Sequence, residues 1–200
     1  EQFVSQNVAH KNALQALQRK VIRTSFAEQA YLHLIEQLKK QIRAIDTEVR
    51  RLIESDPTFK EMLLLLLSVP GVGLLLASHF ILLAQFSLEY KLLASFLGIA
   101  PHEHSSGTSV YKPATSRHFG PPAIRKLLYL AACSVCTHRP QFRTYLARKT
   151  QQGKPARLVL NNVENKLIRI MCAMLSSKTA FIESYHSVQP LALQKALTVS

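Results

Sequence analysis

Acidic residues are scarce in this chain: 12 Asp and Glu stand against 25 Lys and Arg, which gives a formal net charge of +13. The shortage is greatest in residues 101–180, where thirteen basic residues accompany only two acids, Glu103 and Glu164. Phosphoryl transfer that depends on metal needs several carboxylates to hold Mg²⁺, and this segment does not supply them. The localised positive charge predicts a polyanionic partner, first nucleic acid and second an anionic membrane surface.

Cysteine is also rare. Three cysteines without regular spacing argue against a disulfide framework and indicate reduced thiols in a cytoplasmic protein. We expect Cys133, Cys136 and Cys172 to be small buried hydrophobes. Pro and Gly at 70–73 interrupt the apolar run of residues 62–86, so neither half is long enough to cross a membrane. The sequence starts at Glu1 without Met or a signal segment, which predicts a mature protein or an excised piece.

The first quarter of the sequence has a heptad pattern. Apolar residues recur three and four positions apart from Leu14 to Leu52, with Thr24 and Glu28 at two seam positions between them. This pattern predicts one coiled-coil helix with a polar interruption, paired with another helix or subunit. A long amphipathic helix packed on its own domain is the alternative. Asp56-Pro57 should end the helix, because Pro lacks the N–H that a continuing helix needs.

The rest of the chain predicts more helices, at about 59–67, 74–85, 88–97, 123–137, 141–151 and 156–178. We find no convincing strands, apart from a candidate short pair around Ser109-Val110-Tyr111. The predicted fold is therefore all-α, a long coiled-coil helix followed by a compact domain of several helices. We place the dimerisation helix region at 1–57, the domain at 58–186 and a tail of unknown role at 187–200.

The turn between the second and third of these helices contains Pro70-Gly71-Val72-Gly73. Glycine lets the backbone approach a ligand closely, and the amides that lead into the next helix carry partial positive charge. These features are typical of a helix-hairpin-helix, which would hold nucleic-acid phosphates without reading bases. A plain tight turn between two helices would have the same sequence.

The segment from Pro101 to Pro122 lacks helical periodicity and predicts a functional loop. It contains Ser105-Ser106-Gly107 among histidines and cations. A serine beside glycine can attack a phosphodiester while Lys or Arg offsets the growing charge, although ordinary turns also contain such pairs. His102 and His104 leave a structural metal site incomplete, and we predict no metal here.

Six motifs in the same order resemble the C-terminal domain of DEDD-type insertion-sequence transposases, the insertion-sequence-110 (also 116 and 902) family. They span about residues 60–180 and comprise Leu67-Ser68-Val69-Pro70-Gly71-Val72-Gly73, Phe96-Leu97-Gly98-Ile99-Ala100-Pro101, Ser106-Gly107, Ser116-Arg117-His118-Phe119-Gly120 with Arg125 and Leu128, Gly153-Lys154, and Asn165-Lys166-Leu167. Relatives usually have Lys-Arg-Gly where this chain has Arg117-His118-Phe119-Gly120.

In that family a RuvC-like N-terminal domain holds an acidic tetrad and Mg²⁺, a coiled coil pairs subunits, and the C-terminal domain supplies a serine that attacks DNA. The resemblance implies Ser106, directly before glycine, as the nucleophile, with Ser105 as the fallback. It further implies a prokaryotic, cytoplasmic recombinase that mobilises an insertion sequence and in some branches uses a guide RNA. The acidic domain is absent, so we expect Mg²⁺ to bind elsewhere and this chain to be inactive alone.

The residues expected to contact phosphates of DNA or guide RNA are Gly71, Gly73, Lys112, Arg117, Arg125, Lys126, Arg143, Arg148, Lys149, Lys154 and Arg157. The expected assembly is a homodimer or larger through the coiled coil, with no membrane contact. The alternative function is a non-catalytic helix-hairpin-helix module that only binds nucleic acid. A structural coiled-coil protein with incidental positive charge ranks third.

Overall fold

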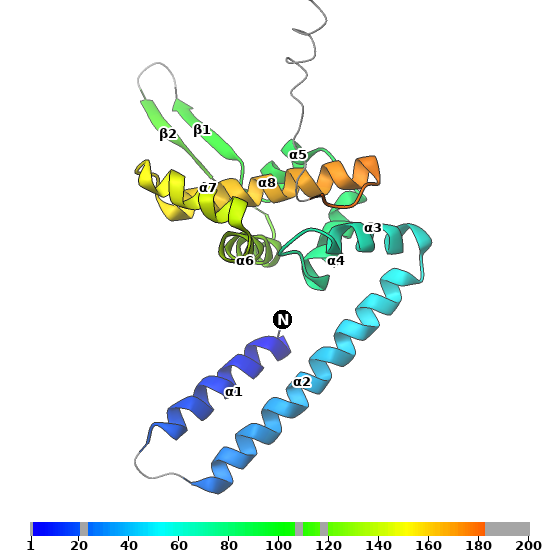
Figure 1. The fold of residues 1–200 in the computed structure, drawn as a ribbon, viewed down its shortest axis with the longest axis vertical. Helices are drawn as coiled ribbons and strands as arrows, with labels where there is room; N and C mark the ends of the chain where they lie inside the picture. Colours follow the sequence, from blue (N-terminus) through cyan, green and yellow to red (C-terminus); the bar gives the residue numbers. More distant parts are fainter. Residues whose placement is uncertain (1, 21–23, 107–109, 117–119, 183–200) are drawn as a thin grey trace, which may run out of the picture.

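The structure is a computed structural model that describes residues 2–20, 24–106, 110–116 and 120–182, with only the backbone described for 101–106 and 110–116. The described residues form eight α-helices and one two-stranded β-hairpin (Figure 1). The first two helices make an arm, and the other six form a domain with one shared core. The predicted all-α class is confirmed for the body of the chain. No helix in the described ranges is long and apolar enough to span a membrane.

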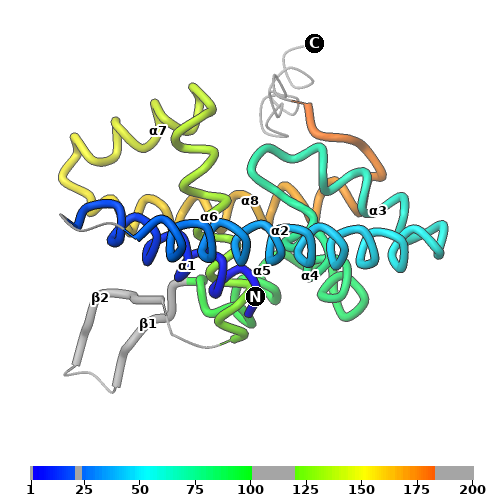
Figure 2. The backbone as a smooth tube through the Cα atoms, turned by 90° about the horizontal axis from the view of Figure 1, so that it is seen from below, coloured from blue at the N-terminus to red at the C-terminus, as the bar shows by residue number. Residues whose placement is uncertain are grey.

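The arm consists of α1 (Gln2–Gln18) and α2 (Ser25–Glu54), which lie side by side in opposite directions. Figure 2 shows α1 next to the first half of α2, whose second half leads to the domain. The rings of His10 and Tyr31 are 5.9 Å apart, and Leu14 and Ile35 are buried where the helices meet. The arm therefore contains an intramolecular helix pair.

The prediction of one continuous helix through residues 14–52 is wrong. Helix α1 ends at Gln18, and α2 begins after Thr24, whose backbone is extended with φ −110° and ψ 108°. The seam lacks an apolar residue at Thr24, and Thr and Ser favour helix starts over helix interiors. The polar interruption in the heptad pattern is thus the point where the chain reverses.

The transition from arm to domain is sharp, as the sequence predicted. Helix α2 stops before Asp56, whose Oδ1 accepts hydrogen bonds from the amides of Thr58 (2.7 Å) and Phe59 (3.1 Å). Pro57 occupies the first position of α3 (Pro57–Leu67), where its missing N–H costs nothing. Asp56 therefore caps α3, while Pro57 prevents α2 from continuing.

The domain core lies between α3, α4 (Leu74–Ala84), α6 (Pro122–His138) and α8 (Ala156–Ser177). Leu63, Phe80, Leu128 and Ile168 come from these four helices and are fully buried. The long apolar run that we read as core thus fills α3 and α4. All three cysteines are free thiols, and the predicted burial is confirmed for Cys136 and Cys172, whereas Cys133 is only partly buried.

Shorter elements surround this core. Helix α5 (Tyr90–Phe96) packs against α8, and Gly98, two residues after its end, has a φ of 66° that favours glycine. Helix α7 (Pro140–Gln151) packs against α6 and α8. We expected a loop from Pro101 to Pro122, but this segment contains strands β1 (Pro101–Ser106) and β2 (Val110–Ser116), so the candidate short pair near Val110 is part of a longer hairpin.

Candidate nucleic-acid interface

The predicted nucleophile lies at the end of the hairpin. Strands β1 and β2 are antiparallel, with Ser106 paired to Val110 and Ser105 paired to Tyr111. Backbone hydrogen bonds join the facing edges of the two strands, with a shift in register between His102 and His104. This pairing explains how a polar segment without helical periodicity forms strands. Figure 1 shows the hairpin extending away from the helices. The side chains of Ser105, Ser106 and Lys112 lie outside the described part.

Gly120 joins the end of the hairpin region to α6. Its φ is +86°, and a Cβ built there would lie 2.3 Å from the carbonyl oxygen of Phe96 and 2.9 Å from Cα of Leu97. A side chain would therefore collide with backbone at the end of α5. The hairpin leaves the domain from Ile99 and returns at Gly120, and both points are packed against α5 or α8. Arg117, predicted to bind phosphate, lies outside the described residues.

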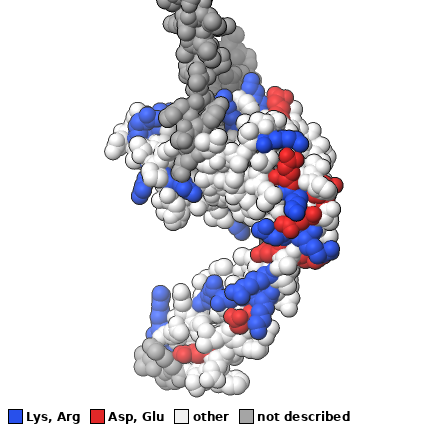
Figure 3. Space-filling view, turned by 45° about the vertical axis from the view of Figure 1, so that its right-hand side comes forward, with Lys and Arg blue, Asp and Glu red and all other residues white. Residues whose placement is uncertain are grey.

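The predicted basic residues fall into two groups on the helices. Arg125 and Lys126 lie in the first turns of α6, and Arg157 lies in the first turn of α8. The second group, on α7 and the turn that follows it, consists of Arg143, Arg148, Lys149 and Lys154. Most of these side chains are exposed, although Lys149 donates a hydrogen bond to Oε1 of Gln152 at 3.1 Å. Figure 3 shows that acidic and basic groups mix over α2 and its junction with the domain.

Glu164 is an acid that lies near Arg125 and Arg157 of the first group. It is only 6% exposed, and burial raises its pKa to about 7, although Arg125 and Arg157 are near enough to lower that pKa. At neutral pH a large fraction of Glu164 is therefore protonated. This carboxyl then cancels only part of the positive charge of the two arginines, which favours an anion at this surface.

Sequence reasoning missed several side chains near these groups. Tyr129 follows Arg125 by one turn of α6 and is 42% exposed, so it offers a ring beside a cation. Lys166 lies over the ring of Phe142 (5.5 Å), and Arg169 lies over that of Tyr90 (5.4 Å). The four-residue spacing of Arg125 and Tyr129 was the available signal, but only the fold shows that Arg157 lies close to them.

The two glycines of the predicted helix-hairpin-helix have different surroundings. Gly71 has φ +80°, and a Cβ there would lie 2.9 Å from both the carbonyl oxygen of Ala131 and Cγ1 of Val135 on α6. Close packing of α3–α4 against α6 therefore explains this glycine. Gly73 precedes α4 and has open space around it. Phosphate binding by either residue stays a prediction.

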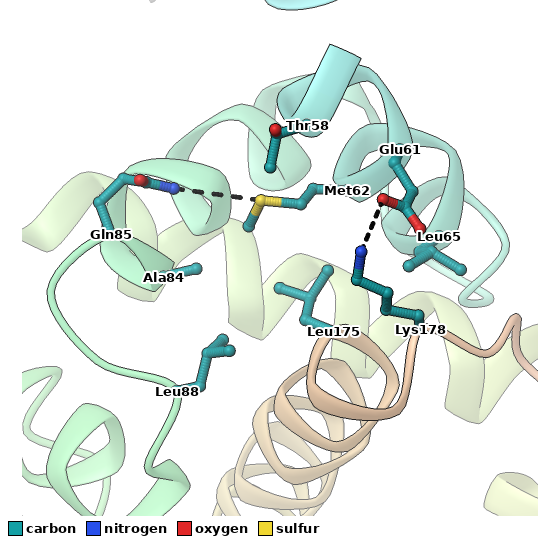
Figure 4. A pocket seen from close by; sticks show the side chains of 9 residues that line it. All are labelled: Thr58, Glu61, Met62, Leu65, Ala84, Gln85, Leu88, Leu175 and Lys178. Carbon is teal, nitrogen blue, oxygen red and sulfur yellow. Dashed lines mark hydrogen bonds and ion pairs between the residues drawn. The ribbon is translucent and has the colours of Figure 1, made fainter. Parts of the chain in front are cut away.

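A cavity of about 180 Å³ lies between α3, α4 and the end of α8 (Figure 4). Met62, Leu65 and Leu175 give it an apolar wall, and Lys178 pairs with Glu61 at 3.3 Å at its edge. It is at the other end of α8 from Arg157, so it does not belong to the basic surface. Within the described ranges, no group of three or more His, Cys, Asp or Glu could hold a metal ion.

The fold and surface define a helical domain with a projecting hairpin and clustered cations. Residues 63–147 match the family model described as Transposase IS116/IS110/IS902 family. The pilin gene-inverting proteins of Moraxella lacunata and Moraxella bovis are each 28% identical to the chain over 149 residues, covering 72% of the chain and 46% of each relative. An IS110 uncharacterized 43.6 kDa protein of Streptomyces coelicolor is 30% identical over 148 residues, covering 72% of the chain and 35% of the relative.

The family model places its match in the domain and its hairpin. The matched segment starts in α3, includes both strands and ends in α7. The chain spans less than half the length of the curated relatives it matches. The resemblance to insertion-sequence transposases is thus supported for residues 63–147.

Proposed function

We propose that this chain is the DNA-binding and strand-transfer portion of a transposase or site-specific recombinase that mobilises an insertion sequence. The observation that carries the proposal is the family match over residues 63–147, which contains the whole hairpin. Ser106 is the proposed nucleophile, and Ser105 is the second candidate. The basic groups around α6, α7 and α8 support a polyanionic partner.

The proposed chemistry is a transesterification. Oγ of Ser106 attacks a backbone phosphorus atom, one Oγ–P bond forms, and one P–O bond to a deoxyribose oxygen breaks. The seryl proton passes to the oxygen that leaves, so a free DNA hydroxyl and a phosphoserine ester result. A second DNA end reverses the step with its own hydroxyl. Bond energy is kept in the ester, and no high-energy cofactor is consumed.

We infer that the Mg²⁺ used in this reaction is held outside the basic surface of α6 and α8. Glu164 is the one acid on α8, and it lies between two arginines, which disfavours a cation. We therefore propose that an acidic RuvC-like domain supplies the metal site and that this chain is inactive without it. Within this chain, Arg125 and Arg157 would hold DNA phosphates beside the base of the hairpin.

The arm supports a dimer. Helix α1 covers the first half of the α2 seam, while Ile45 and Leu52 in the second half are 45% and 56% exposed. Asn7 is buried in the arm, and its Oδ1 has no hydrogen-bond partner within the described ranges. A second subunit packed along the second half of α2 would cover the exposed seam positions. A guide RNA is a further proposed partner for the α7 cations.

A protein–DNA adduct assay tests the nucleophile. The chain is supplied with the acidic domain, incubated with element-end DNA and Mg²⁺, and run on a denaturing gel. We expect the adduct to disappear in Ser106→Ala and to persist in Ser105→Ala. An undiminished adduct in Ser106→Ala would show that the assignment is wrong.

The same variants separate catalysis from simple binding. A non-catalytic helix-hairpin-helix module would bind DNA with a steep salt dependence, a slope of about −0.9 per phosphate contact, and would form no adduct at all. Failure to bind any polynucleotide at moderate salt would instead favour a structural coiled-coil protein.

A further inference from the structure

Two asparagines of α8 hold the start of the hairpin. Nδ2 of Asn161 and Nδ2 of Asn165 both donate hydrogen bonds to the carbonyl oxygen of Ile99, at 3.0 and 2.9 Å. Nδ2 of Asn165 also donates to the carbonyl oxygen of Asn161 at 3.0 Å. Ile99 is 1% exposed and lies two residues before β1 begins. Both bonds connect segments more than sixty residues apart in the sequence.

Residues 99 and 100, which connect α5 to β1, are hydrogen-bonded to two helices. The amides of Ile99 and Ala100 both donate to the carbonyl oxygen of Ala94, which ties the connection to α5. Pro101 has no N–H, so the first residue of β1 cannot donate a backbone hydrogen bond. Asn161 and Asn165 link the same segment to α8. Because the Ile99 carbonyl oxygen accepts from both side chains, its hydrogen-bonding capacity is fully used.

We propose that Asn161 and Asn165 are positioning residues that set the direction of the β1–β2 hairpin and thereby the place of Ser106. Ser106 lies five residues beyond Pro101, roughly 17 Å along the strand. A tilt of about ten degrees at the base would therefore move Ser106 by about 3 Å, and a misplacement of about 1 Å can cost about 100-fold in rate. The part that concerns Ser106 rests on the proposed function.

Hydrogen exchange of backbone amides in residues 101–106 and 110–116 tests the clamp without any activity. The variants are Asn161→Leu, Asn165→Leu and the double variant, since Leu keeps the approximate volume and removes the donor. The matched control is Asn162→Leu on the same helix, because the Asn162 side chain makes no hydrogen bond to any described residue. We expect at least about tenfold faster hairpin exchange in the double variant and no change in the control.

A conservative variant distinguishes the donor from simple packing. Asn165→Asp can donate only when its carboxyl is protonated, so hairpin protection should return as the pH falls. Unchanged exchange in a folded double variant would overturn the proposal, as would equal acceleration in Asn162→Leu. If the double variant does not fold, Asn161→Leu decides, because it keeps the Asn165 bond and should give a smaller acceleration.

Strand transfer gives the second readout. In the chain supplied with the acidic domain, the double variant should form the DNA adduct about 10- to 100-fold more slowly, with DNA affinity within about twofold of the parent. An unchanged adduct rate would overturn the part that concerns Ser106. If Ser106→Ala still forms the adduct, the proposed nucleophile fails, while the exchange data still decide whether the asparagines hold the hairpin.

Discussion

The domain and the arm are both helical, but they bury their helices very differently. In the domain, α8 is 22 residues long and buries nine of them, from Val159 to Leu175. In the arm, α2 is 30 residues long and buries only Ile35. Helix α2 nevertheless has the clearer division into an apolar and a polar face. Helix α1 covers the first half of this apolar stripe, and the exposed second half is where we propose that a second subunit packs. Helix α8, by contrast, owes its stability to intramolecular packing.

This contrast also explains how the site is supported. The chain enters the hairpin at Ile99 and returns at Gly120, where α8 and α5 contact it, and we propose that these contacts set the position of the hairpin. Changes in the domain should therefore affect both stability and the hairpin. Changes in the arm should mainly affect subunit pairing.

The largest expected effect is at Gly120 in the domain. Gly120→Ala forces a Cβ against the Phe96 carbonyl at 2.3 Å in a left-handed conformation, so backbone must move. We expect a loss of about 4 kcal/mol or more in the free energy of unfolding. Chemical denaturation followed by circular dichroism measures it.

Gly153→Ala is the matched control for that variant. Gly153 has a similar φ of +79° but no atom within 4 Å of a Cβ, so only backbone strain of about 1 kcal/mol is expected. Equal losses in the two variants would show that the contact with α5 is unimportant.

The second effect compares core positions in the two regions. Leu167→Ala removes a side chain that is 1% exposed in α8, and we expect a loss of about 3 kcal/mol. Leu52→Ala, at a position 56% exposed in the arm, should cost less than about 0.5 kcal/mol in the monomer but weaken dimerisation. Chemical denaturation at low protein concentration measures the loss of stability in both variants, and analytical ultracentrifugation measures the weaker dimerisation of Leu52→Ala. If Leu52→Ala lowered the stability of the monomer as much as Leu167→Ala does, the contrast between the arm and the domain would be wrong.

The third effect depends on pH. Glu164 has a pKa of about 7 in the fold against an ordinary value of 4.5. Between these values the folded chain keeps a proton that the unfolded chain has lost, so stability falls as the pH rises, by up to about 3 kcal/mol. Glu164→Gln should flatten this dependence and be more stable than the parent at pH 8. Thermal melts from pH 4 to pH 8 measure it, and an unchanged slope would rule out Glu164 as its cause.

The sequence was sufficient for the regular helices because their signals are local. Asp56-Pro57 fixes a helix boundary, Gly98 ends α5, and apolar spacing shows α8, all close to where the structure has them. Leu14 and Ile35 of the predicted seam are buried between α1 and α2, but the seam does not lie on one helix, and Leu52 is exposed. Periodicity continues across a turn of suitable length, so it cannot distinguish a bent-back pair from a straight rod.

The site was less predictable because it depends on contacts between distant segments. Pro101, Pro113 and a mixed polar composition hid the hairpin, since strand pairing here has little apolar alternation to reveal it. The serine motif and the basic helices were visible. That Arg125, Arg157 and Glu164 meet, and that Asn161 and Asn165 hold Ile99, follows only from the packing of α8.

The smallest effect that we predict is in the arm, at Asn7. Its Oδ1 is buried beside α2 without a hydrogen bond to any described group, which costs about 1 kcal/mol or more. Asn7→Leu should therefore raise the stability of the α1–α2 pair by about 1 kcal/mol, measured by helix melting at low protein concentration. The matched control is Gln6→Leu, because Gln6 is exposed in the same turn, and it should change stability by less than about 0.5 kcal/mol. A loss of stability in Asn7→Leu that grows with protein concentration would mean that the amide bonds across a dimer, and the arm would then owe its register to the second subunit.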